Sequence, residues 1–251
     1  MHAAPEVIRH ATAEDVAHAV AARLVTRLTD LQAAGLAPSV ALTGGTIANA
    51  SYHALAGSPA RSGVDWSRVE FWWGDERFVR AGDVKQRNAA QAREALLDRV
   101  PVSASRVHEM PASDGPYGDD VDAAAAWYAE ELRRATPAEE GGDTPVFDIL
   151  LLGIGEDGHC ASLMPGSAAL HDERPVVAVR DSPKPPPTRI SLTMGPLMRS
   201  RELWWIASGA AKATPVRRAL AGADVTEVPA AGPKGVERTL WLLDEAAAAE
   251  L

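Results

Sequence analysis

The sequence predicts an α/β fold in which a mostly parallel, Rossmann-like sheet carries helices on both faces. One observation is that short apolar runs of strand length alternate with segments whose apolar residues recur at helical spacing. Another is the run FDILLLGIG at 147–155, the near-continuous apolar type that is buried on both faces of a parallel sheet. No internal repeat and no long linker divides the chain, so we expect one domain over residues 1–251.

The first half of the chain predicts two strands and four helices. The first helix, over 15–34, follows Thr12, which has Asp15 three residues on, and stops at Gly35. The other elements expected here are a strand from Ser39 that breaks on a glycine pair, a helix over 47–55, a strand at 69–73, a helix over 88–98 and a helix over 120–134.

The second half predicts most of the remaining strands. They are expected within 147–155, at 175–179, at 189–192, at 202–207 and at the start of 239–251, whose end is expected to be a short helix; a further helix is expected over 212–220. In open parallel sheets, ligands bind beyond the carboxyl ends of the strands. The glycine-rich breaks of this sequence all follow predicted strands, so we look for functional residues there.

The composition excludes several classes of protein. Lys+Arg 25 against Asp+Glu 34 gives a formal net charge of -9, which argues against a nucleic-acid or anionic-membrane binder but leaves room for a small anionic ligand. Cys160 is the single cysteine, so neither an intrachain disulfide nor a multi-cysteine metal site is possible. No run of about 18 apolar residues occurs, and the N-terminal residues do not resemble a signal peptide. We expect a soluble, cytoplasmic protein.

The turn Thr43-Gly44-Gly45-Thr46 is the first candidate site. Glycines allow backbone N–H groups to approach an anion, and the following helix N-terminus favours negative charge. The turn is neither a Walker A loop nor a GxGxxG motif. A tight turn with a threonine cap is the alternative interpretation, so the phosphate site stays a hypothesis at this point.

Three adjacent charged residues, Asp75, Glu76 and Arg77, follow the strand at 69–73. Arg77 has the donor geometry to grip a phosphate, and Asp75 or Glu76 is suited to position a water or a sugar hydroxyl. A solvated loop with a local ion pair explains the same residues equally well.

The segment GIGEDGHCAS at 153–162 carries the sharpest signal. Its glycines indicate a sharply bent backbone after the most buried strand, and His159 emerges from the bend with Asp157 two residues before it. We predict that His159 is a general base that Asp157 orients or charge-stabilises, and a structural histidine is the alternative interpretation. Ser162 lacks a nucleophile elbow, and Cys160, as a direct neighbour of His159, is expected to point away from it. No spacing suits zinc, so no metal is expected.

Two more cations complete the candidate set. Lys212 follows the strand at 202–207 behind Gly209 and two alanines, where a compact charge can reach a phosphate. A surface helix residue is the alternative for Lys212. Arg189, just after a proline cluster, is a weaker candidate that is equally suited to an ion pair.

Taken together, four segments resemble the 6-phosphogluconolactonases, sugar-phosphate hydrolases related to the glucosamine-6-phosphate deaminases and isomerases. They are TGGT at 43–46, WWGDERFV at 72–79 with the helix NAAQAREALL behind it, LLGIGEDGHCASLMPGS at 151–167 and KPPPTRISLT at 184–193. The departures are small: Thr43, Ile47, Cys160 and Met164 stand where that family commonly has serine, proline, threonine and phenylalanine.

The resemblance implies hydrolysis of 6-phospho-D-glucono-1,5-lactone, with no metal or organic cofactor. It implies that His159 activates water beside the lactone carbonyl and that backbone N–H groups of the glycine-rich bend stabilise the oxyanion. The residues implied to hold the phosphate are Gly44, Gly45, Thr46, Arg77, Lys212 and Arg189, while Asp75 or Asn88 contacts sugar hydroxyls or braces Arg77. The expected partner is a small sugar phosphate, and the expected assembly is a monomer or small homo-oligomer.

Two alternatives stay open. The related amino-sugar deaminases carry a glutamate shortly after the histidine, whereas here the continuation is CASLMPG, which favours lactone hydrolysis. A non-catalytic sugar-phosphate sensor of the same fold would keep Arg77 and Lys212 without needing His159.

Overall fold

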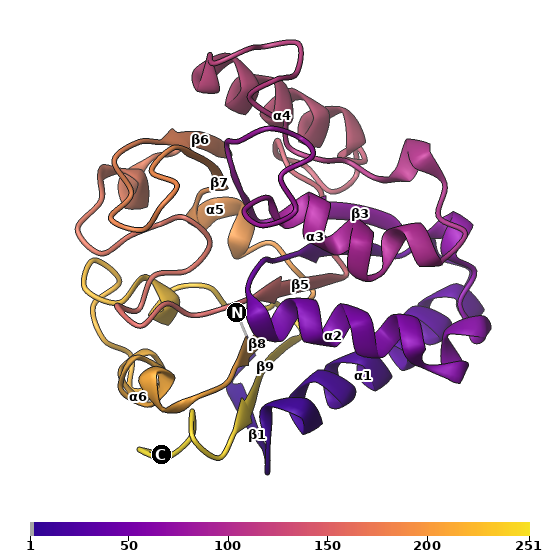
Figure 1. Ribbon diagram of the computed structural model, residues 1–251, viewed down its shortest axis with the longest axis vertical. Coiled ribbons are helices and arrows are strands. Elements are labelled where there is room, and N and C mark those ends of the chain that lie inside the picture. Colours follow the sequence, from indigo (N-terminus) through magenta and orange to yellow (C-terminus); the bar gives the residue numbers. More distant parts are fainter. Residues whose placement is uncertain (1–2) are drawn as a thin grey trace.

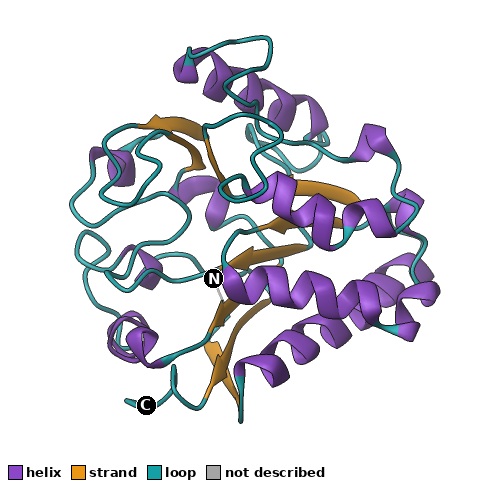
Figure 2. Ribbon diagram, in the orientation of Figure 1, coloured by secondary structure: helices purple, strands orange, loops and turns teal. Residues whose placement is uncertain are grey.

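The computed structural model describes residues 3–251 and contains a central parallel sheet with a smaller sheet beside it (Figures 1 and 2). Across the described residues the central sheet has six strands in the order β1-β9-β8-β5-β2-β3, and every neighbouring pair is parallel. Its strands are β1 (Pro5–His10), β2 (Ser39–Leu42), β3 (Glu70–Trp73), β5 (Ile149–Leu152), β8 (Glu202–Ala207) and β9 (Arg238–Asp244). With helices on both faces, this is the α/β fold that the sequence predicts.

The helices follow the predicted ranges within a few residues, except for the short α5, which was not predicted. They are α1 (Ala13–Ala33), α2 (Thr46–Gly57), α3 (Asn88–Ala95), α4 (Val121–Ala135), α5 (Met194–Leu197) and α6 (Ala213–Leu220). At the start of α1, Thr12 and Asp15 form a capping box, and the chain leaves the helix through Gly35 with φ +85°. Helices α1 and α2 pack side by side, while α4 contacts the smaller sheet (Figure 1).

The smaller sheet is antiparallel, in the order β4-β7-β6. Its strands are β4 (Asp75–Arg77), β6 (Val176–Val179) and β7 (Arg189–Leu192). The ranges predicted for β6 and β7 are accurate. The sequence pattern did not show, however, that these two strands belong to a separate antiparallel sheet. Residues 75–77 were expected to follow the end of a strand, but they form strand β4. The chain continues from β3 through Gly74 directly into β4, which pairs with β7.

Two ends of the chain differ from expectation. Strand β1 was not predicted, since PEVIRH at the sheet edge is mostly exposed and lacks an apolar run. Residues 245–250 form turns instead of a short helix. There the Asp244 carboxylate accepts hydrogen bonds from the N–H groups of Ala247 and Gly209, which ties the chain end to the β8–α6 connection.

Two buried tyrosines fix the strand ends that lead into the site. The Tyr52 hydroxyl, from α2, donates to the Thr43 carbonyl at 2.8 Å and accepts from the Thr43 N–H at 3.1 Å. The Tyr128 hydroxyl, from α4, makes the same pair of bonds to the backbone of Trp73 at the end of β3. The backbone at each of these strand ends is therefore held by a tyrosine from a covering helix. Within residues 3–251, no helix has the length and apolar character needed to cross a membrane.

Candidate active site

A cleft of about 460 Å³ lies between the carboxyl ends of the parallel strands and the small antiparallel sheet. Its volume is in the range of small-molecule sites. The cleft brings together the following residues that the sequence singled out: Gly44, Gly45, Thr46, Asp75, Arg77, Asn88, His159, Arg189 and Lys212. Asp157 is not part of the cleft lining and borders a second hollow behind His159.

The turn after β2 presents unused backbone donors to the cleft. Gly45 is the N-cap of α2 and provides no side chain to satisfy the first turn of the helix. In the part of the chain that the structure describes, the N–H groups of Gly44, Gly45 and Thr46 donate no hydrogen bond. Free N–H groups at a helix N-terminus form an anion site, so the geometry favours the phosphate interpretation of this turn.

Gly44 also has a packing role. A Cβ atom added there would lie 1.9 Å from Oδ1 of Asn88. Asn88 is buried, and its Nδ2 donates to the Asp75 carbonyl at 3.0 Å, so it is not free to move aside. The turn after β2 therefore depends on glycine to fit against the first residue of α3.

His159 and Asp157 form a hydrogen-bonded pair. His159 Nδ1 lies 2.5 Å from Asp157 Oδ1, and Lys184 Nζ lies 3.6 Å from the same oxygen. Burial raises the pKa of Asp157, but the hydrogen bond from His159 and the charges of His159 and Lys184 outweigh burial and hold that pKa well below its usual range. Because Nδ1 is bonded to a carboxylate, the other ring nitrogen of His159 is the one left to exchange protons with a ligand.

The bend that carries this pair is held by its own backbone. A Cβ atom at Gly155 would lie 2.0 Å from His159 Nδ1 and 2.3 Å from Asp157 Oδ1, so the pair folds back over a position that must be glycine. The N–H groups of Gly155 and Gly158 donate to carbonyls within the bend, and the His159 N–H donates to Asp157. The resemblance implies that N–H groups of this bend stabilise an oxyanion, and these three N–H groups already donate within the bend.

The small sheet contributes charged side chains. On β4, alternate residues face the same side, so Asp75 and Arg77 line the cleft while Glu76 points away from it. Asp75 Oδ2 accepts a hydrogen bond from the Ser162 hydroxyl at 2.6 Å, and Arg77 Nη1 donates to the Gln86 carbonyl at 2.7 Å. Arg77 is thus braced from the loop that follows it.

Arg189 is more structural than expected. It is almost fully buried; Nε donates to the Pro186 carbonyl at 3.1 Å and Nη2 donates to the Lys184 carbonyl at 2.8 Å. These bonds hold the proline segment against the cleft. Arg189 therefore lines the site while using part of its donor set to position Lys184.

Lys184 is a cleft residue that sequence reasoning missed. The signal was present, since Lys184 opens the KPPPT segment directly before the selected Arg189. Lys212 enters from the connection between β8 and α6, where burial and the neighbouring Lys184 lower its pKa while Glu156 opposes them. With Arg77 and Arg189, these lysines give the cleft a concentration of positive charge inside an acidic protein.

Neither alternative nucleophile faces the cleft. Ser162 is fully buried and its hydroxyl is committed to Asp75. Cys160 is also fully buried, and burial together with the Asp75 charge raises the pKa of its thiol. Among residues 3–251, Asp157 is the carboxylate that touches His159, and residues 160–166 add none.

Comparison with known proteins places these features in one family. Residues 11–241 match the family model described as glucosamine-6-phosphate isomerases/6-phosphogluconolactonase. The chain is 53% identical to a 6-phosphogluconolactonase from Streptomyces coelicolor, over 98% of this chain and 95% of that one, and 46% identical to one from Mycobacterium leprae, over 91% of each. Among solved structures, the 6-phosphogluconolactonase from Trypanosoma brucei matches with a TM-score of 0.84 and 29% identity, over 100% of both chains.

Proposed function

The chain belongs to the glucosamine-6-phosphate isomerase/6-phosphogluconolactonase family, and we propose that it hydrolyses 6-phospho-D-glucono-1,5-lactone to 6-phospho-D-gluconate in the oxidative pentose phosphate pathway. The observation that carries this proposal is the single cleft in which the paired His159 faces the free N–H groups of α2 and four cationic side chains. A phosphate and an electrophilic carbonyl of one small ligand can be held there together. We further propose that one catalytic domain spans residues 1–251 and acts in the cytoplasm.

The phosphate is held at the N-terminus of α2. The N–H groups of Gly44, Gly45 and Thr46 supply short hydrogen bonds, while Arg77 and Lys212 supply charge. Asp75 and Asn88 face the sugar hydroxyls from the small-sheet side of the cleft. Because the whole protein is acidic, affinity depends on these short contacts more than on long-range attraction.

Catalysis uses His159 as a general base. Its free ring nitrogen takes a proton from water as the water oxygen bonds to C1 of the lactone. The resulting tetrahedral intermediate collapses with cleavage of the bond between C1 and the ring oxygen, and His159 returns the proton to that oxygen. Asp157 stabilises the imidazolium that exists between the two transfers. An activated lactone needs no metal or organic cofactor for this reaction.

The proposal is tested by hydrolysis of freshly generated lactone, measured above its spontaneous rate. We expect saturable turnover, with kcat/KM at least about 100-fold lower for glucono-1,5-lactone, which lacks the phosphate. Ammonia release from glucosamine 6-phosphate without lactone turnover would indicate a deaminase. Binding of 6-phosphogluconate with turnover of neither substrate would indicate a sensor.

A further inference from the structure

Glu76 is a fully buried carboxylate that the catalytic scheme does not use. It sits between Asp75 and Arg77 on β4, and its side chain points away from the cleft that both neighbours line. Sequence alone suggested a role in contacting water or a sugar hydroxyl, and the structure excludes direct contact because Glu76 has no exposed surface.

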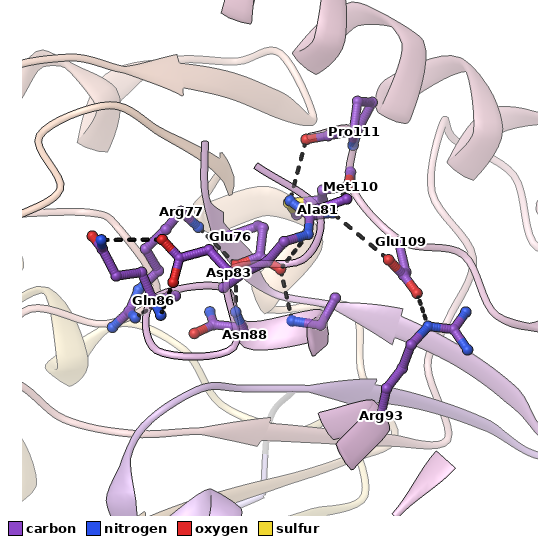
Figure 3. Close-up of polar contacts among 12 residues, drawn as sticks. Glu76, Arg77, Ala81, Asp83, Gln86, Asn88, Arg93, Glu109, Met110 and Pro111 are labelled. Atoms are coloured by element: carbon purple, nitrogen blue, oxygen red, sulfur yellow. Dashed lines mark hydrogen bonds and ion pairs between the residues drawn. The ribbon is translucent and has the colours of Figure 1, made fainter. Parts of the chain in front are cut away.

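The contacts of Glu76 join two distant points of the backbone (Figure 3). Oε1 accepts from the N–H of Arg77 at 2.8 Å and from the N–H of Asn88 at 2.7 Å, and Oε2 accepts from the N–H of Ala89 at 2.8 Å. One side chain thus closes the loop 78–87 at both ends. The two residues at those ends, Arg77 and Asn88, both place their side chains in the cleft.

Glu76 also replaces a helix cap. Arg87 precedes α3 and makes no side-chain cap, so the first N–H groups of that helix would otherwise lack a partner. A carboxylate at a helix N-terminus satisfies those groups and complements the helix dipole. Glu76 therefore fixes where α3 begins and, with it, the position of Asn88 against Gly44.

A second ion pair holds the network from the far side. Arg87 is almost fully buried, with Nε 3.9 Å from Glu76 Oε2 and Nη2 3.7 Å from Glu109 Oε2. The Arg87 guanidinium also donates to the carbonyls of Met110 and Pro111. The last residue of the loop is therefore locked between Glu76 and segment 109–111, and Glu109 in turn pairs with Arg93 on α3 (Figure 3).

The charged form of Glu76 is costly to bury. Burial raises the pKa of Glu76 to about 7, although Arg87 and the three N–H groups lower it. A carboxyl whose pKa is higher in the folded than in the unfolded chain costs folding free energy at neutral pH. Together with this cost at neutral pH, the three backbone N–H groups that Glu76 accepts from point to a role in geometry.

We propose that Glu76 is a positioning residue that sets Arg77 for the phosphate end of the substrate and holds Asn88 in place against the Gly44 turn. The inference rests on the proposed function, because it assigns Glu76 an effect on substrate affinity. Removing its charge lets the 78–87 loop and Arg77 move, while the His159–Asp157 pair, which lies on a different loop, keeps its geometry.

The test is a double-mutant cycle between Glu76→Gln and Arg77→Ala, read as KM and kcat for the lactone. Glutamine keeps the shape but loses the charge and one acceptor oxygen. We expect Glu76→Gln to raise KM about 10-fold with kcat within about 3-fold, and to raise KM less than about 2-fold when Arg77 is already alanine. Equal increases in both backgrounds, or an effect confined to kcat, would overturn the proposal.

Glu109→Gln is the matched control. It removes a carboxylate from the same ion-pair network without touching the backbone of Arg77 or Asn88, and KM should stay within about 2-fold of the wild-type value. An equal rise in KM for Glu109→Gln would show that general loosening explains the effect, and the proposal would be wrong. If Glu76→Gln does not fold, Glu76→Asp, which keeps the charge on a shorter side chain, takes its place in the cycle.

Calorimetric binding of 6-phosphogluconate separates this proposal from the proposed function. If the wild-type protein binds 6-phosphogluconate but does not hydrolyse the lactone, the lactonase proposal fails, and the dissociation constant replaces KM in the same cycle. If Glu76→Gln leaves that dissociation constant unchanged while wild-type turnover is normal, the role of Glu76 fails alone. A wild-type protein that neither binds nor turns over would refute both.

Discussion

The carboxyl edge of the parallel sheet and the small antiparallel sheet face the same cleft, but they bring different groups to it. The parallel edge contributes main-chain donors at Gly44–Thr46 and side chains on exposed loops, His159 and Lys212. The small sheet contributes Asp75, Arg77 and Arg189, which are charged residues within paired strands.

This difference has an energetic consequence. Loop side chains at the parallel edge are partly solvated, so changing one should alter the chemistry and leave the fold intact. The charges of the small sheet are buried and compensate one another, through Asp75 with Ser162 and Arg189 on the cleft side and Glu76 with Arg87 behind it. Removing one member of such a set leaves another buried and unpaired, so changes there should affect stability and function together.

The largest expected effect is on the parallel edge. His159→Gln should lower kcat for the lactone about 100-fold or more, because glutamine cannot accept and return a proton. The melting temperature should stay within about 2 °C, since His159 lies on a loop and, among residues 3–251, its side chain makes a hydrogen bond only to Asp157. A large drop in melting temperature would contradict the proposed difference between the loops of the parallel edge and the small sheet. A nearly unchanged rate would refute the general-base role.

Arg189→Ala tests the other side of the comparison. The change removes the guanidinium that supports the proline segment and faces Asp75, so we expect about 3 kcal/mol of destabilisation together with roughly 30-fold lower kcat/KM. Urea unfolding and lactone kinetics measure the two effects. A loss of activity with wild-type stability would show that Arg189, like the loop residues of the parallel edge, affects the reaction without supporting the fold.

Gly44→Ala tests the contact between the two regions. The added methyl group would lie 1.9 Å from Asn88 Oδ1, so the turn or Asn88 must shift, and we expect kcat/KM to fall roughly 10-fold. Gly57→Ala is the control, because a Cβ atom at the last residue of α2 meets nothing within 4 Å. Equal activities for the two variants would mean that the Gly44–Asn88 contact does not position the ligand.

The smallest expected effects concern the pH dependence of stability, which should run in opposite directions for Asp157 at the parallel edge and Glu76 in the small sheet. The pKa of Asp157 is lowered by folding, so its contribution to stability is present above about pH 3.8 and is lost as the pH falls below that value. The pKa of Glu76 is raised from 4.5 to about 7, so its contribution is present below about pH 4.5 and is lost as the pH rises through about 7.

Unfolding free energies of Asp157→Asn and Glu76→Gln against pH check this prediction. As the pH rises, the loss of unfolding free energy that Asp157→Asn causes relative to wild type should grow through about pH 4. The loss of unfolding free energy that Glu76→Gln causes should shrink between about pH 5 and 7. Curves that run in the same direction would contradict the assignment of the two environments.

Local signals in the sequence located most of the elements and most of the residues that line the cleft. Periodicity located every described α-helix except the four-residue α5, and the apolar run before Gly153 located the central strand. Glycine-rich breaks at strand ends identified both the turn at Gly44 and the bend at His159, because a parallel sheet gathers its carboxyl ends at one edge. Those signals are short-range, so they can be read along the chain.

The tertiary structure alone decided how the polar residues divide between surface, cleft and interior. Nothing local separates Glu76 from Asp75 and Arg77; their assignment follows from the pairing of β4 with β7, more than a hundred residues away. The same pairing turns Arg189 into a buried support and brings Lys184 to Asp157. The sequence by itself thus determined the fold class and indicated the candidate residues at the parallel edge. The long-range strand pairing, which no local pattern encodes, decided which charged residues line the cleft and which lie buried behind it.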